Sequence, residues 1–301
     1  MTKVSVILTT YNSERTISRT LDSILCQVGI GTSFDLELLV VDDCSTDRTT
    51  DILRSRGITY FPTEHNTGGP NAGRNMAMRE STGDYIAFID HDDVWHRHKL
   101  TRQLDAADKA PIITCLHAVS RGSAPILDRH NSKTGAITRL AENTSFMNLL
   151  KRKHHGQNTY FSTIMIHRSL KDILFEENFG MVDFDWLLRL FHERASIQVN
   201  APLVTRFVGE GNLSLHERYR RCDYHYSLYA LESYEDTYPS AVAMGRRRIN
   251  GTRARYYYVI GNMRKSRRYF THSPLDVKSL MYFLTTFAGS AWVKQNFRVF
   301  G

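Results

Sequence analysis

Short apolar runs alternate with helical patterns over the first 90 residues, and this alternation limits the fold more than any other feature of the chain. The runs at 4–8, 36–41, 59–61 and 85–89 are rich in β-branched and aromatic residues, which is typical of buried strands. A strand–loop–helix order that repeats in this way predicts a parallel sheet with helices on both faces. We therefore expect an α/β fold.

Helical spacing fills the intervals between these runs. Apolar residues recur at helical spacing from Ile17, and further helices are expected at 47–54 and 71–78. Ser45 is the expected N-cap of the second helix and Gly57 its C-terminal end. With 42% hydrophobic and 23% charged residues, the 301-residue chain is globular in composition, which excludes a disordered or collagen-like protein.

The cysteines and the first residues indicate the compartment. Cys26, Cys44, Cys115 and Cys222 lie far apart without a CxxC pair, so reduced thiols in a cytosolic protein are expected. The apolar run that follows Met1 is too short for a secretory signal peptide and lacks a cleavage site of small residues. Cytoplasmic localisation is therefore the expectation.

Three of the predicted strands run directly into polar loops, at 9–12, 42–45 and 90–93. Ligands of open α/β sheets bind beyond the carboxyl ends of the strands. Because the carboxyl ends of parallel strands meet at one edge, these loops are expected to form a single site.

Carboxylates dominate two of these loops. Asp90, Asp92 and Asp93 repel one another unless a cation lies among them, and their hard oxygens suit Mg²⁺ or Mn²⁺. A solvated acidic turn is the alternative. The acidic pair at 42–43 can accept hydrogen bonds from a ribose hydroxyl or a nucleobase N–H, or else cap a helix together with Ser45.

Five segments, in order and at matching spacing, resemble the inverting family 2 glycosyltransferases with the GT-A fold. They are VSVILTTYN at 4–12, LVVDDCSTD at 39–47, NTG at 66–68, GRNMA at 73–77 and GDYIAFIDHDD at 83–93. The ordered set is highly specific, whereas the resemblance weakens toward residue 215 and does not cover the tail. It implies a Rossmann-like, mostly parallel sheet flanked by helices.

The resemblance also implies a domain organisation. A GT-A domain is expected over 1–215, with a nucleotide-binding half at 1–110 and an acceptor-side half at 111–215. A helical, basic and aromatic C-terminal region is expected over 216–301. Tyr160 lies on the segment expected on the acceptor side.

The resemblance assigns roles to residues of the polar loops. The nucleotide is expected to contact Thr10, Tyr11, Asn12, Asp43, Arg74, Asp90 and His91. Mn²⁺ or Mg²⁺ is expected at Asp90 and Asp92, which form the family's DXD element, and at the adjacent Asp93. A cation at this loop is consistent with the implied reaction, because a divalent cation stabilises the charge that grows on a departing diphosphate. Histidines near this loop invite a zinc site, but the surrounding hard oxygens argue against zinc.

Inversion requires a general base that takes the proton from the attacking hydroxyl. The resemblance places it in the stretch at 180–189, where Asp183 falls on the family's Asp and Val182 replaces the usual Glu. Asp183 is the expected base and Asp185 the alternative, unless both only support the start of a helix. A loop over the diphosphate or the metal is expected at three basic residues, His216, Arg220 and Arg221.

The excess positive charge of the chain lies in its tail. Residues 244–301 hold 12 Lys or Arg and one acidic residue, so this stretch carries +11 against +8 for the whole chain. The uncharged run at 279–293 is too short for a bilayer core of about 30 Å but suits a helix in the membrane interface. Helices packed on the body and a homo-oligomer interface are the alternatives. Nucleic acid is not expected, because no known binding module is present.

The function implied by the resemblance is metal-dependent transfer of one sugar from a nucleotide-sugar, UDP-linked as the first choice. A hydroxyl of a glycan or lipid-linked acceptor would receive it, in the synthesis of a bacterial surface polysaccharide, lipopolysaccharide or other glycoconjugate. The expected location is the inner face of the cytoplasmic membrane. The alternatives are a nucleotidyltransferase that makes a nucleotide-sugar and a non-catalytic scaffold. The missing phosphate-binding glycine loop argues against the first, and the intact DXD element against the second.

Overall fold

The computed structural model describes residues 1–107, 110–121, 136–153, 156–208 and 217–292. The chain divides into two compact units, the first formed by Met1–Phe146 with Gly156–Asn212 and the second by Met147–His155 with Leu213–Gly301. The expected domain boundary at 215 lies beside this division and stays a prediction. The sequence did not indicate that the short segment 147–155 belongs with the second unit.

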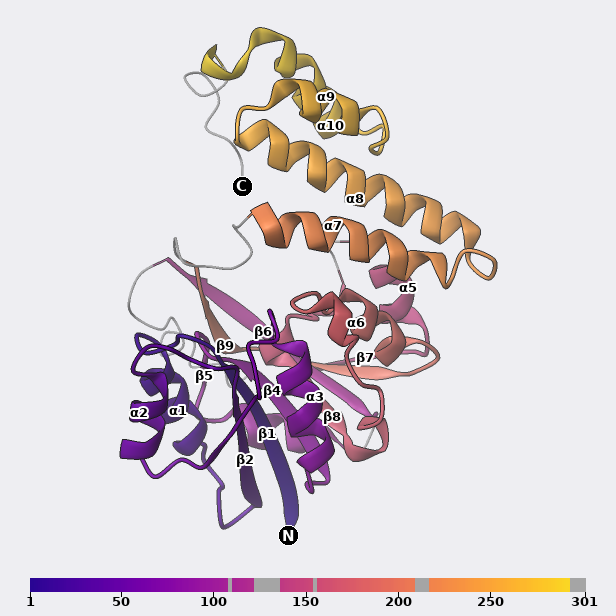
Figure 1. Ribbon diagram of the computed structural model, residues 1–301. Helices are drawn as coiled ribbons and strands as arrows, with labels where there is room; N and C mark the ends of the chain where they lie inside the picture. Colours follow the sequence, from indigo (N-terminus) through magenta and orange to yellow (C-terminus); the bar gives the residue numbers. More distant parts are fainter. Residues whose placement is uncertain (108–109, 122–135, 154–155, 209–216, 293–301) are drawn as a thin grey trace. The chain divides into compact units, whose positions relative to one another are not determined.

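The first unit is built around one sheet (Figure 1). Its strands are β1 (Thr2–Thr10), β2 (Phe34–Asp42), β3 (Tyr60–Pro62), β4 (Tyr85–Asp90), β5 (Val94–Trp95), β6 (Ile112–Ser120), β7 (Ile137–Leu140), β8 (Met165–His167) and β9 (Ser196–Phe207). Its α-helices are α1 (Ile17–Leu25), α2 (Thr49–Ser55), α3 (Asn71–Glu80), α4 (Lys99–Leu104) and α6 (Phe184–Phe191), while α5 (Thr144–Leu150) begins in the first unit and ends in the second.

The sheet order explains how the polar loops meet. In the described residues the order is β3-β2-β1-β4-β8-β6-β9-β5, with β7 paired to β9. Strands β1 to β4 pair in parallel, and the register sets Thr10 opposite Asp42 and Thr9 opposite Asp90. The carboxyl ends of β1, β2 and β4 therefore lie at one edge, as expected. Beyond β4 the sheet is mixed, because β8 is antiparallel to both β4 and β6.

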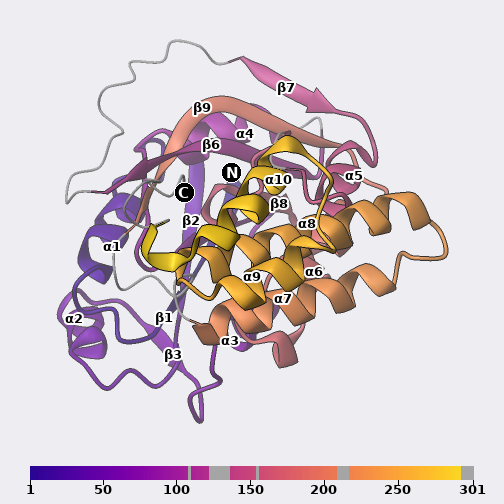
Figure 2. The same cartoon turned by 90° about the horizontal axis from the view of Figure 1, so that it is seen from above.

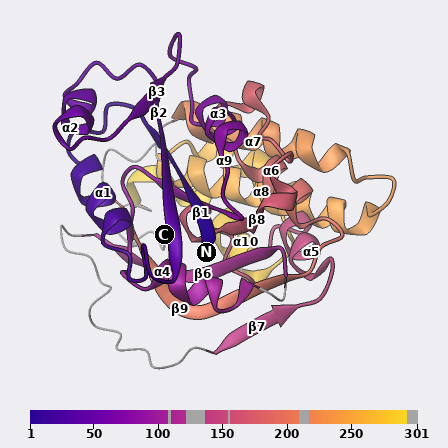
Figure 3. The same ribbon diagram turned by 90° about the horizontal axis from the view of Figure 1, so that it is seen from below.

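Helices cover both faces of the parallel strands. Helices α1 and α2 lie on one side of β1 and β2, and α3 lies on the other side (Figures 1 and 3). Side chains of β1, β2, β4 and α1 form a fully buried core, among them Val6, Leu8, Val40, Ile89 and Leu21. The predicted α/β fold is confirmed.

One local prediction is wrong. Ser45 does not cap α2, whose N-cap residue is Arg48. The hydroxyl of Ser45 instead donates to Oδ1 of Asp42 at 2.6 Å, while Asp47 accepts the N–H of Thr49 in the first turn of the helix. The Ser45 side chain thus binds the carboxylate at the end of β2 and not the backbone of α2. Gly57, with φ of +67°, follows the end of α2 as predicted.

The second unit is helical in its described part. Its helices are α7 (Glu217–Glu232), α8 (Pro239–Val259), α9 (Met263–Phe270) and α10 (Val277–Thr285), and α7, α8 and α9 lie side by side (Figure 2). Ala254, Tyr258, Met263 and Phe270 form a small buried core. The uncharged run expected as one helix at 279–293 is interrupted, because α10 ends at Thr285. None of the helices described is long and apolar enough to cross a membrane.

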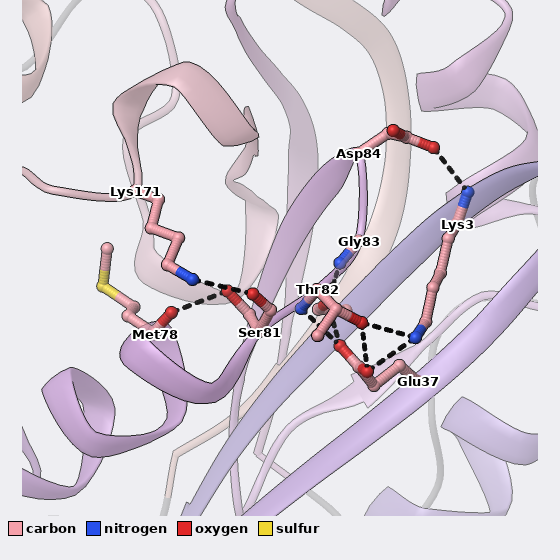
Figure 4. A network of polar contacts seen from close by, with 9 residues as sticks. Lys3, Glu37, Met78, Ser81, Thr82, Gly83, Asp84 and Lys171 are labelled. Carbon is pink, nitrogen blue, oxygen red and sulfur yellow. Dashed lines mark hydrogen bonds and ion pairs between the residues drawn. The ribbon is translucent and has the colours of Figure 1, made fainter.

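A polar network joins the amino-terminal parts of the parallel strands, opposite the edge with the polar loops (Figure 4). Glu37 of β2 accepts hydrogen bonds from Lys3 Nζ at 2.7 Å, from the hydroxyl of Ser5, and from both the N–H and the hydroxyl of Thr82. Burial alone would raise the pKa of Glu37, but these hydrogen bonds outweigh it and lower the pKa to about 2. The network thus holds the starts of β1, β2 and β4 together.

Glu37→Gln is expected to lower the free energy of unfolding by about 1–2 kcal/mol at pH 7, because hydrogen bonds to a charged acceptor are lost. Since the folded pKa lies below the ordinary 4.5, this contribution is present above pH 4.5 and disappears as the pH falls toward 2. Urea unfolding of both proteins at several pH values measures the difference. The control is Asp51→Asn, which removes an exposed ion pair with Arg54 and should change little. A difference that does not vary with pH would contradict the assignment.

Candidate active site

The loops after β1 and β2 are joined by hydrogen bonds. Asn12 accepts the N–H of Thr46 at 2.8 Å and donates its own N–H to the hydroxyl of Ser45 at 2.9 Å. The hydroxyl of Thr10 donates to Asp42 at 2.8 Å. Asn12 has a positive φ of 46°, which Asn tolerates better than most residues. Tyr11 between them is exposed, so its ring is free to contact a ligand.

Asp43 is nearly buried and is held from one side. Its two oxygens accept the N–H of Thr67 at 2.9 and 3.1 Å, and Oδ1 also accepts the hydroxyl of Thr63 at 3.0 Å. A carboxylate offers about four acceptor positions. Asp43 therefore keeps room for one further donor, which is what a nucleobase contact requires.

The acidic loop after β4 is tied to helix α3 by an ion pair. Arg74 Nη2 lies 2.9 Å from Oδ1 of Asp90, and the Arg74 guanidinium lies 3.6 Å from the ring centroid of Phe161. Arg74 and Asp90 were both assigned to the nucleotide from the sequence, and the structure brings them into contact. His91 lies with Nδ1 3.4 Å from the hydroxyl of Thr16 at the start of α1.

Asp92 and Asp93 have different surroundings. Burial, with repulsion from Asp90, raises the pKa of Asp92 despite the opposing charge of His91. No other described residue donates a hydrogen bond to its carboxylate, whereas its backbone carbonyl accepts Arg19 Nη2 at 3.0 Å. Asp93 is fully buried, and the hydroxyls of Tyr160 and Ser162 donate to its Oδ2. Burial first, and then repulsion from Asp90 and Asp92, raises the pKa of Asp93 well above its usual range.

The donor set at this loop suits a hard divalent cation. No cluster of three or more His, Cys, Asp or Glu side chains is arranged for a metal in the part of the chain that is described. Mg²⁺ commonly binds through one or two carboxylates and completes its shell with phosphate oxygens and water. Asp90 and Asp92 fit that pattern, since no other residue in the described part of the chain donates a hydrogen bond to the Asp92 carboxylate. For Asp93 a metal role stays a prediction, and its carboxyl is already engaged by two hydroxyls.

The two candidate bases stand at the start of α6. Asp183 occupies the N-cap position without a side-chain capping bond. Asp185 is paired with Arg189, whose Nη2 lies 2.7 Å from Oδ2 and also donates to the carbonyl of Leu174. The Asp185 carboxylate is thus already engaged by a neighbouring guanidinium. Asp183 as the base and Asp185 as its alternative both stay predictions.

Helix α3 also holds the segment that leads to Asp183. The amide of Asn71 donates to the carbonyls of Glu176 and Val182, and its backbone N–H donates to the carbonyl of Gly180. Gly180 has a φ of +59°, and a Cβ on Gly69 would lie 2.3 Å from the Gly180 carbonyl carbon and oxygen. The two loops are therefore in backbone contact. Asn71 and Arg74 together connect the acidic loop to the loop of the candidate base.

The expected basic loop differs from the structure. Arg220 and Arg221 lie on α7, a helix of the second unit, and His216 lies outside the described residues. Their contact with the diphosphate stays a prediction. Sequence reasoning also missed Asn71, Ser162 and the hydroxyl contact of Tyr160. Only Asn71 carried a signal, since it stands at the start of the predicted helix, but its partners are more than 100 residues away.

Comparison with known proteins identifies the family. The model of glycosyl transferase family 2 matches residues 5–174, more than half of the chain. The chain therefore belongs to glycosyl transferase family 2, as its sequence motifs suggested.

Two similar relatives carry glycosyltransferase names. The poly(ribitol-phosphate) β-N-acetylglucosaminyltransferase TarS of Staphylococcus aureus is 39% identical over 104 residues, which are 33% of this chain and 18% of TarS. The putative teichuronic acid biosynthesis glycosyltransferase TuaG of Bacillus subtilis is 40% identical over 107 residues, which are 34% of this chain and 40% of TuaG. The match thus spans less than half of the length of these relatives.

Two solved structures are similar over almost the whole chain. Residues 1–349 of S. aureus TarS in complex with UDP-GlcNAc align with a TM-score of 0.59 and 17% identity, covering 97% of this chain and 91% of that one. The mannosyltransferase PcManGT of Pyrobaculum calidifontis, solved with GDP-Man and Mn²⁺, aligns with a TM-score of 0.52 and 16% identity, covering 97% and 87%. At such identities the likeness shows the fold.

Gly69→Ala is expected to lower the free energy of unfolding by about 1–3 kcal/mol, because the new Cβ meets the Gly180 backbone. The displaced Gly180 backbone should also loosen the segment 180–184, which would be seen as faster amide hydrogen exchange in that segment. The control is Gly57→Ala, which places a Cβ in open space at a positive φ and should destabilise without changing exchange at 180–184. Unchanged exchange in Gly69→Ala would refute the coupling of the two loops.

Proposed function

We propose that this protein transfers a single sugar from a nucleotide-sugar, with UDP-linked donors favoured, to a hydroxyl of a glycan or lipid-linked acceptor, with inversion at the anomeric carbon. The observation that carries the proposal is the connected set of side chains in the first unit. The ion pair of Arg74 with Asp90 fixes the acidic loop, and Asn71 on the same helix holds the loop that carries Asp183. A donor site and a candidate base are thus positioned by one helix.

The loops after β1 and β2 form the nucleotide side of the proposed site. Tyr11 offers an exposed ring, and Asp43 keeps acceptor capacity for a nucleobase N–H or ribose hydroxyl. Thr10 and Asn12 hold the two loops in position. His91 is part of the acidic loop, and the guanidinium of Arg74 beside it reduces the net negative charge near a diphosphate.

The chemical step needs one proton acceptor. In the proposed step the Asp183 carboxylate takes the proton of the acceptor hydroxyl as its oxygen bonds to the anomeric carbon. The bond from that carbon to the diphosphate oxygen breaks at the same time, and the diphosphate leaves with the electron pair. Asp90 and Asp92 would hold Mn²⁺ or Mg²⁺, which supplies positive charge for the diphosphate when it is bound.

The names of the similar proteins support the proposed substrates. TarS and TuaG are named for cell-envelope polymers, and TarS was solved with UDP-GlcNAc. We therefore place the proposed activity in the synthesis of a bacterial surface polysaccharide, lipopolysaccharide or related glycoconjugate. PcManGT was solved with Mn²⁺, which supports a divalent ion in the proposed mechanism.

The second unit supports a proposed location at the inner face of the cytoplasmic membrane. Leu280, Met281 and Leu284 on α10 are more than half exposed, and Phe287 follows them at 65% exposure. Basic residues of α9 belong to the same unit. Exposed apolar side chains combined with Lys and Arg suit a helix that lies in the headgroup region. Self-association through the same surface stays an alternative.

A donor-release experiment tests the function. The full chain is incubated with UDP- and GDP-sugars, with and without Mn²⁺ or Mg²⁺, and the free nucleoside diphosphate is measured. Metal-dependent release from one donor is expected, and Asp92→Asn should lower it by about 100-fold, since transition-state charge stabilisation is lost. Full activity of that variant would refute the metal role. Release of pyrophosphate from a nucleoside triphosphate and a sugar phosphate would instead indicate a nucleotidyltransferase. If no nucleotide binds at all, the protein would be a non-catalytic scaffold.

The identity of the base is tested by a matched pair of variants. Asp183→Asn is expected to lower the rate of sugar transfer by about 10²–10⁴-fold, while donor binding is retained, because only the proton acceptor is removed. Asp185→Asn on the same helical turn should lower it by less than about tenfold, since Asp185 is already paired with Arg189. Transfer kinetics and donor affinity are measured for both. The reverse ranking would assign the role to Asp185.

A further inference from the structure

The second unit contains a pocket in which Arg220 is the one described lining residue with a predicted role in sugar transfer. Its empty volume is about 300 Å³, part of it open to solvent. Helices α7 and α8 supply most of its walls, and the segment 147–155 supplies one further residue. The described lining residues are Arg152, Arg220, Asp223, Tyr224, Ile249, Thr252, Arg253 and Tyr256. Three of these eight carry a guanidinium group and one carries a carboxylate.

Arg253 is the most informative residue of this pocket. It is 6% exposed, and its Nη2 donates to the hydroxyl of Tyr257 at 2.8 Å. Its Nε and Nη1 atoms are buried and have no hydrogen-bond partner. No carboxylate among the described residues forms an ion pair with it. A buried arginine without an anion is unfavourable, because the charge has lost its hydration and gained no counter-charge.

The carboxylate of the pocket is already engaged. Asp223 Oδ1 lies 3.5 Å from Arg152 Nη2 and also accepts the hydroxyl of Ser227 at 3.2 Å. Arg220 forms no ion pair with a described residue, and its buried Nε likewise lacks a hydrogen-bond partner. The pocket therefore has two guanidinium groups in excess over its acidic side chains.

Aromatic packing fixes Arg253 but does not neutralise it. Its guanidinium carbon lies 4.7 Å from the ring centroid of Tyr257, 5.3 Å from that of Tyr256 and 5.7 Å from that of Tyr224. Cation–π contacts of this kind orient the side chain and leave the N–H donors at its edge available. An orientation that is fixed before binding lowers the entropy lost when an anion arrives.

We propose that this pocket binds a phosphate group, with Arg253 and Arg220 as its ligands. Guanidinium groups match phosphate oxygens in geometry and charge. The bound group is a phosphate monoester or diester, carried either by a lipid headgroup or by a soluble phosphate-bearing molecule. The proposal does not rest on sugar transfer, since every residue involved belongs to the second unit and binding is measured directly.

Thermal unfolding of the full chain in inorganic phosphate tests the site, with sodium chloride of equal ionic strength as the reference. Phosphate should raise the Tm of the wild type. Arg253→Gln and Arg220→Gln should each weaken the apparent affinity by about tenfold, the effect of losing one charge-assisted hydrogen bond. The matched control is Arg247→Gln, an exposed arginine of α8 outside the pocket, which should respond as the wild type does. Arg220→Gln keeps the test valid if Arg253→Gln does not fold.

Vesicle flotation then distinguishes the two sources of phosphate. If a lipid headgroup is the ligand, Arg253→Gln and Arg220→Gln bind phosphatidylglycerol vesicles more weakly than Arg247→Gln, whereas no variant binds phosphatidylcholine vesicles. If the ligand is soluble, flotation is equal in all three variants, while the response to inorganic phosphate is still lost in the two pocket variants. Either result supports the site. Equal responses of all three variants in both measurements would overturn it.

Discussion

The ion pair between the buried Arg74 and the partly exposed Asp90 links parts of the first unit that belong to different segments of the chain. Arg74 comes from α3, Asp90 ends β4, and the guanidinium packs on Phe161 of the turn before β8. A guanidinium at 5% side-chain exposure needs an anion nearby, and Asp90 supplies it. The acidic loop is thereby fixed with respect to the helix before any ligand binds. In the proposed reaction, this preorganisation would favour departure of the diphosphate, because the surrounding charges need not rearrange.

Local patterns were sufficient to predict the first half of the sheet. The apolar runs, the helical spacing between them and the end of α2 at Gly57 all follow from short-range chemistry. The positions of Asp43, Asp90 and Asp92 at the ends of strands follow from the same alternation, together with the rule for parallel sheets.

Contacts between distant segments could not be predicted in this way. Asn71 binds the carbonyl of Val182, which is 111 residues away, and Tyr160 donates to Asp93 across 67 residues. No periodicity encodes such pairs, because each depends on how the chain folds back. Ser45 shows the same limit at short range, since only atomic positions decide between capping α2 and binding the Asp42 carboxylate. The mixed part of the sheet arises from β8, a strand of three residues that gave no sequence signal.

The polar network around Glu37 has a consequence for how this architecture changes over evolution. It joins the strands at the edge remote from the loops that carry Asp43 and Asp92, so this part of the polar stabilisation does not depend on the residues of the proposed site. Insertions and substitutions in those loops then leave the Glu37 network intact. A scaffold arranged in this way can acquire new sugars and acceptors without first losing its ability to fold.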